Sequence, residues 1–296
     1  MDSIVLYGAV TAAYAGLAIH FWRTRWGNTK PAAILGWERA AILFPLVLHA
    51  WLLYRGLFAS SDFRFGFGYA LSCSLWLAAL IYWTESLFYP LEGMQPLVLG
   101  LAAACVPLPA LFPGMSSEPY AQSIGFRLHT VAAIAAYSLF TIAALHALLM
   151  TLVERRLHHA RLKANAVGPL AGPLAALPPL LTLEALLFRL ITLGFILLTL
   201  TLVTGIFFSE SVFGRPMPFT HKTVFAIISW GIFAALLAGR HFYGWRGRTA
   251  LRWTLIGFAA LLLAYVGSRF VLEVILKRGP PEAAAVGAIL KSLFVA

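Results

Sequence analysis

The sequence predicts an all-α fold, a polytopic integral membrane bundle of about eight transmembrane helices. Of its 296 residues, 61% are hydrophobic and only 11% are charged, which is more apolar surface than a soluble domain of this size can bury. The apolar residues gather in stretches of about 20, the length that a helix needs to cross the hydrocarbon core of a bilayer. The loops between these stretches are mostly short, so we expect a single transmembrane domain over residues 1–276.

Each apolar stretch is expected to form one transmembrane helix. In chain order the stretches cover residues 3–22, 38–57, 65–84, 95–112, 127–153, 184–208, 220–240 and 252–276. The fourth contains Pro107 and Pro109, which predict a kinked or broken helix because proline lacks the backbone donor. Residues 277–296 are expected to form a short tail on the outer face.

The distribution of basic residues predicts the orientation. The first stretch is expected to remain in the protein, because a signal peptide carries its positive charge before the apolar run, whereas here Met1-Asp2-Ser3 come first. Lysine and arginine cluster in three connections, those between stretches one and two, five and six, and seven and eight. The positive-inside rule makes these connections cytoplasmic. Both chain ends are then expected on the outer, periplasmic side.

Several functional classes are disfavoured by the residues that the chain lacks. None of the 11 acidic residues lies at the expected bilayer midplane, which argues against a cation-coupled transporter and against catalysis by paired carboxylates.

The net charge of +11 comes from residues beside helix ends, where they meet anionic membrane lipid rather than nucleic acid. Cys73 and Cys105 belong to no CxxC motif and are expected to pack in the core. We expect a protein that is not an enzyme.

Three histidines are candidate ligands of a haem iron. His49 lies beyond the middle of the second stretch, and His129 and His221 lie near the outer starts of the fifth and seventh. Neutral imidazole binds iron through one ring nitrogen while a hydrogen bond holds the other, and an apolar surround favours haem over zinc. Taken singly, each histidine is better explained by a hydrogen bond between two helices. Taken together on one side of the membrane, they favour haem.

Basic residues near the same interface are candidate partners for the haem propionates. Arg127 and Lys222 lie close in sequence to two of the histidines, and Arg269 lies near the outer end of the eighth stretch. Carboxylates at this depth are poorly solvated and need such partners. For Arg269 two alternative roles stay open, because its side chain can also extend to the headgroups or pair with Glu273 one turn later.

Two segments resemble the cytochrome c assembly family of membrane proteins, in its HemX/YpjD-like branch. One covers residues 126–140, where His129 leads a helix that continues to Tyr137 and Phe140, and the other runs from His221 to residue 270 through Gly-Trp-Arg-Gly-Arg at 244–248. The resemblance implies an eight-helix protein of the bacterial inner membrane that handles haem, here haem b, at the outer leaflet. It implies His129 as one iron ligand. The second iron ligand is His221 or His49. Both stay open because His221 stands where better-known members carry an aspartate rather than a histidine.

The chain also departs from that family. The outer loops, at about residues 57–65, 113–126 and 209–220, contain no tryptophan, whereas better-known members present haem on a tryptophan-rich outer loop. The resemblance therefore implies haem binding more firmly than haem delivery. It also implies haem-handling or cytochrome assembly proteins as partners. The alternative is a non-catalytic regulator or partner subunit of haem synthesis or of another membrane complex. It would act through the basic loop at residues 154–182.

Overall fold

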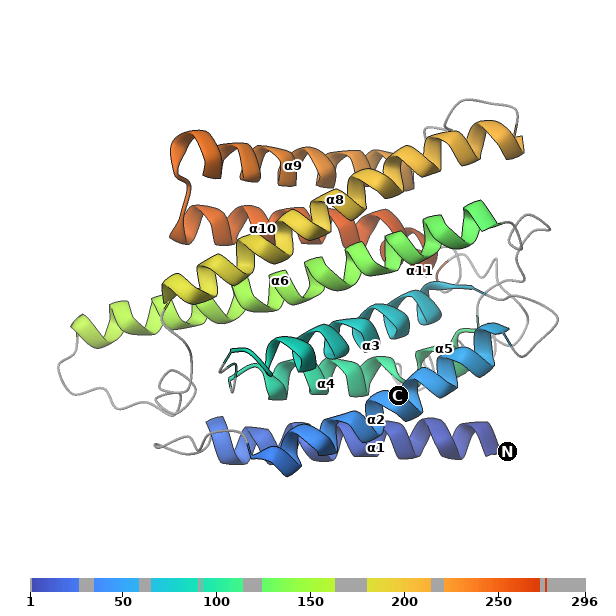
Figure 1. Cartoon of the computed structure of the whole chain (residues 1–296), viewed down its shortest axis with the longest axis horizontal. Helices are drawn as coiled ribbons and strands as arrows, with labels where there is room; N and C mark the ends of the chain where they lie inside the picture. The colour runs from blue at the N-terminus through green and yellow to red at the C-terminus, as the bar shows by residue number, and fades with distance from the viewer. Residues whose placement is uncertain are drawn as a thin grey trace.

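The computed structural model describes residues 2–26, 35–58, 65–89, 91, 93–113, 124–162, 180–213, 221–271 and 275. These residues form helices and turns without a strand, and the long helices run roughly along one axis (Figure 1). Seven of the helices are long and apolar enough to cross a membrane, and a shorter apolar segment, Gln95–Leu111, follows the third of them. The predicted polytopic helical bundle is therefore confirmed. The predicted tail at residues 277–296 lies outside the described residues.

The first half of the bundle is built around the third helix. Its helices are α1 (Asp2–Phe21), α2 (Gly36–Phe58), α3 (Phe67–Glu85), α4 (Gln95–Cys105) and α5 (Leu108–Leu111), with a π-helical turn, η1 (Trp22–Trp26), after α1. α3 packs against α2, α4 and α5, while α1 packs against α2 and α4. The interruption between α4 and α5 falls at Val106 and Pro107. The break predicted from the two prolines is confirmed.

The second half begins with the longest helix, which also joins the two halves. Its elements are α6 (Ile124–Leu162), α8 (Leu180–Phe213), α9 (His221–Tyr243), α10 (Gly247–Leu262), η3 (Leu263–Gly267) and α11 (Ser268–Phe270). α6 packs against α8 and α10 on one side and against α3 on the other, and α9 packs against α8 and α10. The first part of the basic loop predicted at 154–182 is a continuation of α6, whereas residues 163–179 lie outside the described part of the chain.

Glycines let the helices of the second half approach one another around two stacked rings. Phe140 on α6 stacks against Phe233 on α9 with ring centroids 3.9 Å apart. A Cβ added at Gly194 on α8 would lie 3.1 Å from the Phe140 ring, and one added at Gly257 on α10 would lie 2.9 Å from the Phe233 ring. Between membrane helices such close packing supplies much of the association energy. Lipid tails are as apolar as the side chains, so the hydrophobic effect does not drive the helices together.

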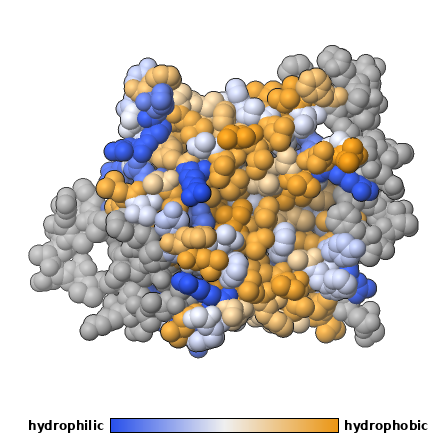
Figure 2. All heavy atoms as spheres, viewed as in Figure 1, coloured by the Kyte–Doolittle hydropathy of each residue, from blue (hydrophilic) through white to orange (hydrophobic). Residues whose placement is uncertain are grey.

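The surface is apolar where a soluble protein would be polar. Apolar side chains cover most of the face shown in Figure 2, and hydrophilic side chains gather mainly toward the two ends of the bundle. Phe44, Ile196 and Ile256 are 64%, 57% and 59% exposed although they lie in the middle of their helices. Lipid is the solvent that tolerates this exposure.

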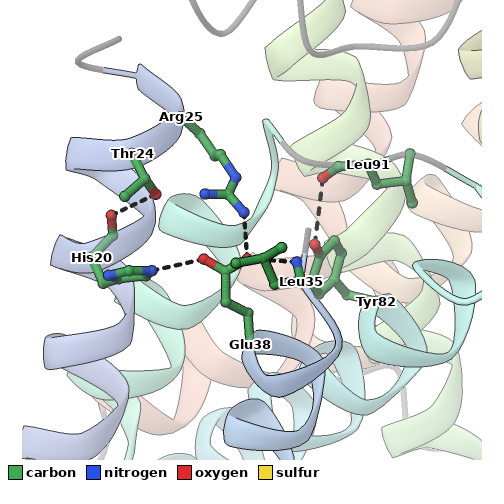
Figure 3. A network of polar contacts seen from close by, with 7 residues as sticks. All are labelled: His20, Thr24, Arg25, Leu35, Glu38, Tyr82 and Leu91. Atoms are coloured by element: carbon green, nitrogen blue, oxygen red, sulfur yellow. Dashed lines mark hydrogen bonds and ion pairs between the residues drawn. The ribbon is translucent and has the colours of Figure 1, made fainter. Parts of the chain in front are cut away.

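A buried ion pair closes one end of the first half. Glu38 at the start of α2 is 2% exposed, and it accepts hydrogen bonds from Arg25 of η1 and from the backbone N–H of Leu35 (Figure 3). Its other oxygen lies 2.8 Å from Nε2 of His20 on α1. The basic residues that follow the first apolar stretch therefore do more than set topology, since Arg25 is itself buried against α2.

Candidate functional site

His129 lies in the second turn of α6, on the face that packs against α8. Its Nδ1 is 3.0 Å from Oγ1 of Thr204. The Thr204 hydroxyl can donate its single hydrogen to the carbonyl of Leu200, 2.7 Å away, or of Thr201, 3.2 Å away. With either carbonyl as its acceptor, its oxygen can accept a hydrogen bond from Nδ1–H of His129. In that tautomer Nε2 of His129 carries the lone pair through which an imidazole binds a metal.

Gly205, the next residue of α8, lets the helix backbone approach the same ring closely. A Cβ added at Gly205 would lie 3.2 Å from Cε1 of His129 and 3.8 Å from its Nδ1. The Cε1–Nδ1 edge of the ring therefore packs against α8. His129 itself is only partly buried. The ring is thus held in place by α8, through Thr204 and Gly205.

His49 lies in the first half of the bundle, among different neighbours. It is fully buried on α2, with Nε2 2.8 Å from Oγ of Ser72 on α3. The ring of Tyr14 on α1 meets it edge-on, at a centroid distance of 5.8 Å. Its Nδ1 and the Tyr14 hydroxyl are buried and have no hydrogen-bond partner among the described residues. Three helices thus enclose this imidazole, and one of its nitrogens is already engaged.

His221 is the first residue of α9 and is exposed. Helices α6 and α9 begin at the same end of the bundle (Figure 1), so His129 and His221 share that end. The contacts described for His49 and His129 join them to other residues and not to another of the three histidines. Within the described ranges no group of three or more His, Cys, Asp or Glu side chains is placed to hold a metal ion.

The predicted basic partners occupy the same end but differ in their surroundings. Arg127 is exposed on α6, two residues before His129. The ammonium of Lys222 lies over the ring of Tyr265 in η3, 5.7 Å from its centroid, a distance at which a cation is attracted to the ring face. The side chain of Arg269 lies outside the described residues.

Thr204 and Gly205 are site residues that no sequence pattern singles out. A threonine in an apolar helix commonly bonds the carbonyl four residues earlier, and the sequence holds many such threonines. Thr204 is 75 residues from His129, so only the pairing of α6 with α8 identifies it.

A further buried histidine lies in the middle of the bundle. His146 of α6 is fully buried, and its Nδ1 is 3.0 Å from the carbonyl of Ile142. Its Nε2 is buried and has no partner in the part of the chain that the structure describes. A hydrogen bond to its own helix and full burial fit a packing role for His146.

Comparison with known proteins gives consistent matches. The family model described as cytochrome C assembly protein matches residues 37–276. The chain is 31% identical over 182 residues to the inner membrane protein YpjD of Escherichia coli strain K12, covering 62% of this chain and 65% of that protein. It is 34% identical over 92 residues to the cytochrome c biogenesis protein CcsA of Gloeobacter violaceus, covering 31% of this chain and 27% of the relative.

A second CcsA, from Prochlorococcus marinus, is 37% identical over 89 residues, covering 30% of this chain and 28% of that protein. The matched stretches thus span less than two thirds of the length of each of these curated relatives. No solved structure matches the chain.

Proposed function

Because this chain belongs to the cytochrome c assembly protein family, we propose that it binds haem through His129 at the outer leaflet and serves cytochrome c biogenesis without catalysing a reaction. The chain is a multi-pass inner membrane protein. The observation that carries the proposal is the hydrogen bond between His129 and Thr204, which leaves Nε2 of His129 free as a ligand.

The residues at this end of the bundle fit a haem group. His129 is only partly buried, and Gly205 lets α8 approach its ring closely and hold it. Arg127 and Lys222 are the basic groups available to the propionates. When bound, haem b would supply a redox-active iron. His129 would hold that iron, and Thr204 would fix the tautomer and the orientation of the imidazole.

His221 is the better candidate for the second ligand. It begins α9 at the end of the bundle where α6 also begins, and its side chain is exposed (Figure 1). The unpartnered Nδ1 of His49 lies in a fully buried site enclosed by three helices, which a haem would first have to open. A bound haem would thus join α6 to α9 across the end of α8.

This end of the bundle is proposed to face the periplasm. Arg25, Arg155, Arg248 and Arg252 lie at the opposite end, where α1 and α6 finish and α10 begins. Arginine is enriched on the cytoplasmic side of inner membrane proteins. The start of α1 would then also lie on the outer side.

Absorption spectra of the detergent-purified protein test the proposal. We expect a Soret band with sharp reduced α and β bands, lost in His129→Ala and in His221→Ala. His241→Ala is the matched control, because His241 is exposed at the other end of α9. Loss of the band in His49→Ala but not in His221→Ala would assign the second ligand to His49. A wild-type protein that binds no haem, even after addition of hemin, would overturn the proposal.

The length of α6 supports a second function, that of a regulator or partner subunit. The helix contains 39 residues, which is about 58 Å at 1.5 Å per residue and far more than a bilayer core of about 30 Å. The basic end of α6, beyond its candidate membrane span at Arg155, therefore extends past the hydrocarbon core. Replacing residues 156–179 by a Gly-Ser linker tests this second function. It should abolish regulation of a partner and leave haem binding unchanged, whereas retained regulation would refute a docking role.

A further inference from the structure

A pocket opens between the end of α6 and the start of α10, far from His129. It has a volume of about 260 Å³, just under the range of about 300–1,000 Å³ typical of small-molecule sites. Its lining includes Glu154 and Arg155 from α6 and Arg248, Leu251, Arg252 and Leu255 from α10. The pocket therefore has room for a headgroup rather than for a large cofactor.

The charge around the pocket is strongly positive. Three arginines and one glutamate line the pocket. The glutamate, Glu154, pairs with one of them: its Oε2 is 3.3 Å from Nε of Arg248. This ion pair is exposed, at 61% for the Arg248 side chain and 30% for that of Glu154, so water screens it. In the described part of the chain Arg155 and Arg252 make no ion pair, and both are exposed. Guanidinium groups bind phosphate with paired hydrogen bonds, for which these arginines are available.

The pocket becomes apolar in the direction of the membrane core. Leu251 is buried, and Leu255 follows one turn later on the same face of α10. The candidate membrane span of α6 ends at Arg155, and that of α10 begins at Gly247. Arg155 and Arg248 therefore lie near the ends of their spans, at the headgroup level, whereas Arg252 lies about one turn further in and Leu255 deepest.

We propose that this pocket binds the phosphate of an anionic phospholipid such as phosphatidylglycerol. The phosphate would lie between Arg155 and Arg252, with Arg248 at its edge, and an acyl chain would run along Leu255. The lipid would link α6 to α10 at an end where the contacts described between them include one exposed ion pair. A free phosphate would satisfy the same arginines, but it would make no use of the apolar side of the pocket.

Lipid titrations followed by native mass spectrometry and thermal melting test this site. The detergent-purified protein is titrated separately with phosphatidylglycerol, phosphatidylcholine and inorganic phosphate. The Arg155→Gln/Arg252→Gln variant should bind phosphatidylglycerol more weakly, by about fivefold for each arginine removed. Arg23→Gln is the matched control, because Arg23 is exposed at the same end of the bundle but outside the pocket. It should bind as the wild type does.

Removing the acidic group provides a test in the opposite direction. Glu154→Gln removes the one negative charge at the pocket, so it should tighten binding of phosphatidylglycerol. Unchanged affinity in the double arginine variant, or equal binding of phosphatidylcholine, would overturn the proposal. An equal stabilisation by inorganic phosphate alone would replace the lipid by a free phosphate.

Discussion

Removal of the Glu38 carboxylate should cost far more stability than removal of a charge at the surface of the bundle. The side chains of Glu38 and Arg25 are only 2% and 3% exposed. In Glu38→Ala the guanidinium of Arg25 stays buried without its carboxylate, and the backbone N–H of Leu35 loses its acceptor. Breaking a buried pair from one side costs about 3–5 kcal/mol. Typical native stabilities are only about 5–15 kcal/mol, so this loss would be a large fraction of the total.

Equilibrium unfolding in mixed micelles, followed by tryptophan fluorescence, measures that cost. The matched control is Glu154→Ala, which breaks the exposed pair with Arg248 and should cost at most about 1 kcal/mol. The double variant Arg25→Met/Glu38→Leu should recover part of the lost stability, because apolar groups replace both charges, while the N–H of Leu35 still lacks its acceptor. If Glu38→Ala and Glu154→Ala were equally stable, the idea that burial decides the contribution of these pairs would be refuted.

Three further predictions concern the second half of the bundle. Gly257→Val should destabilise the protein by about 1–3 kcal/mol in the same unfolding assay, because its Cβ would lie 2.9 Å from the Phe233 ring. Gly244→Ala should cost about 1–2 kcal/mol in that assay, since Gly244 has φ of +66° and no atom lies near its Cβ position. Thr204→Val should weaken haem binding about 10–100-fold in a hemin titration, because Nδ1–H of His129 loses its acceptor.

Each of these has a control that separates the stated cause from a general effect. Gly231→Ala adds a Cβ with no atom within 4 Å and should not destabilise the protein, so an equal loss in both glycine variants would argue against the close approach at Gly257. Thr192→Val removes a hydroxyl that bonds only its own helix among the described contacts. If it weakened haem binding as much as Thr204→Val, the assigned role of Thr204 would be wrong. A Gly244→Asn variant as stable as the wild type supports the positive φ, because asparagine tolerates it.

The sequence by itself determined the class of fold and the depth of each side chain along the bundle axis. Stretches of about 20 apolar residues can satisfy their backbone groups in a bilayer only as helices, so the spans followed from composition and length. The break at Pro107 followed from the missing donor. Depth follows from counting residues at about 1.5 Å each, which is why His129 and His221 were correctly expected at one end of the bundle.

Only the tertiary structure decided which side chains meet across the bundle. His49 and His129 both belong to the half of the bundle where α6 begins, yet one faces Ser72 in the first half and the other faces Thr204 in the second. Similarly, Arg25 looked like a topogenic residue and is instead buried against Glu38. A helix in lipid has no polar face to mark its neighbours, because lipid and protein core are equally apolar. Its rotation and its partners are therefore set by packing between segments far apart in the sequence.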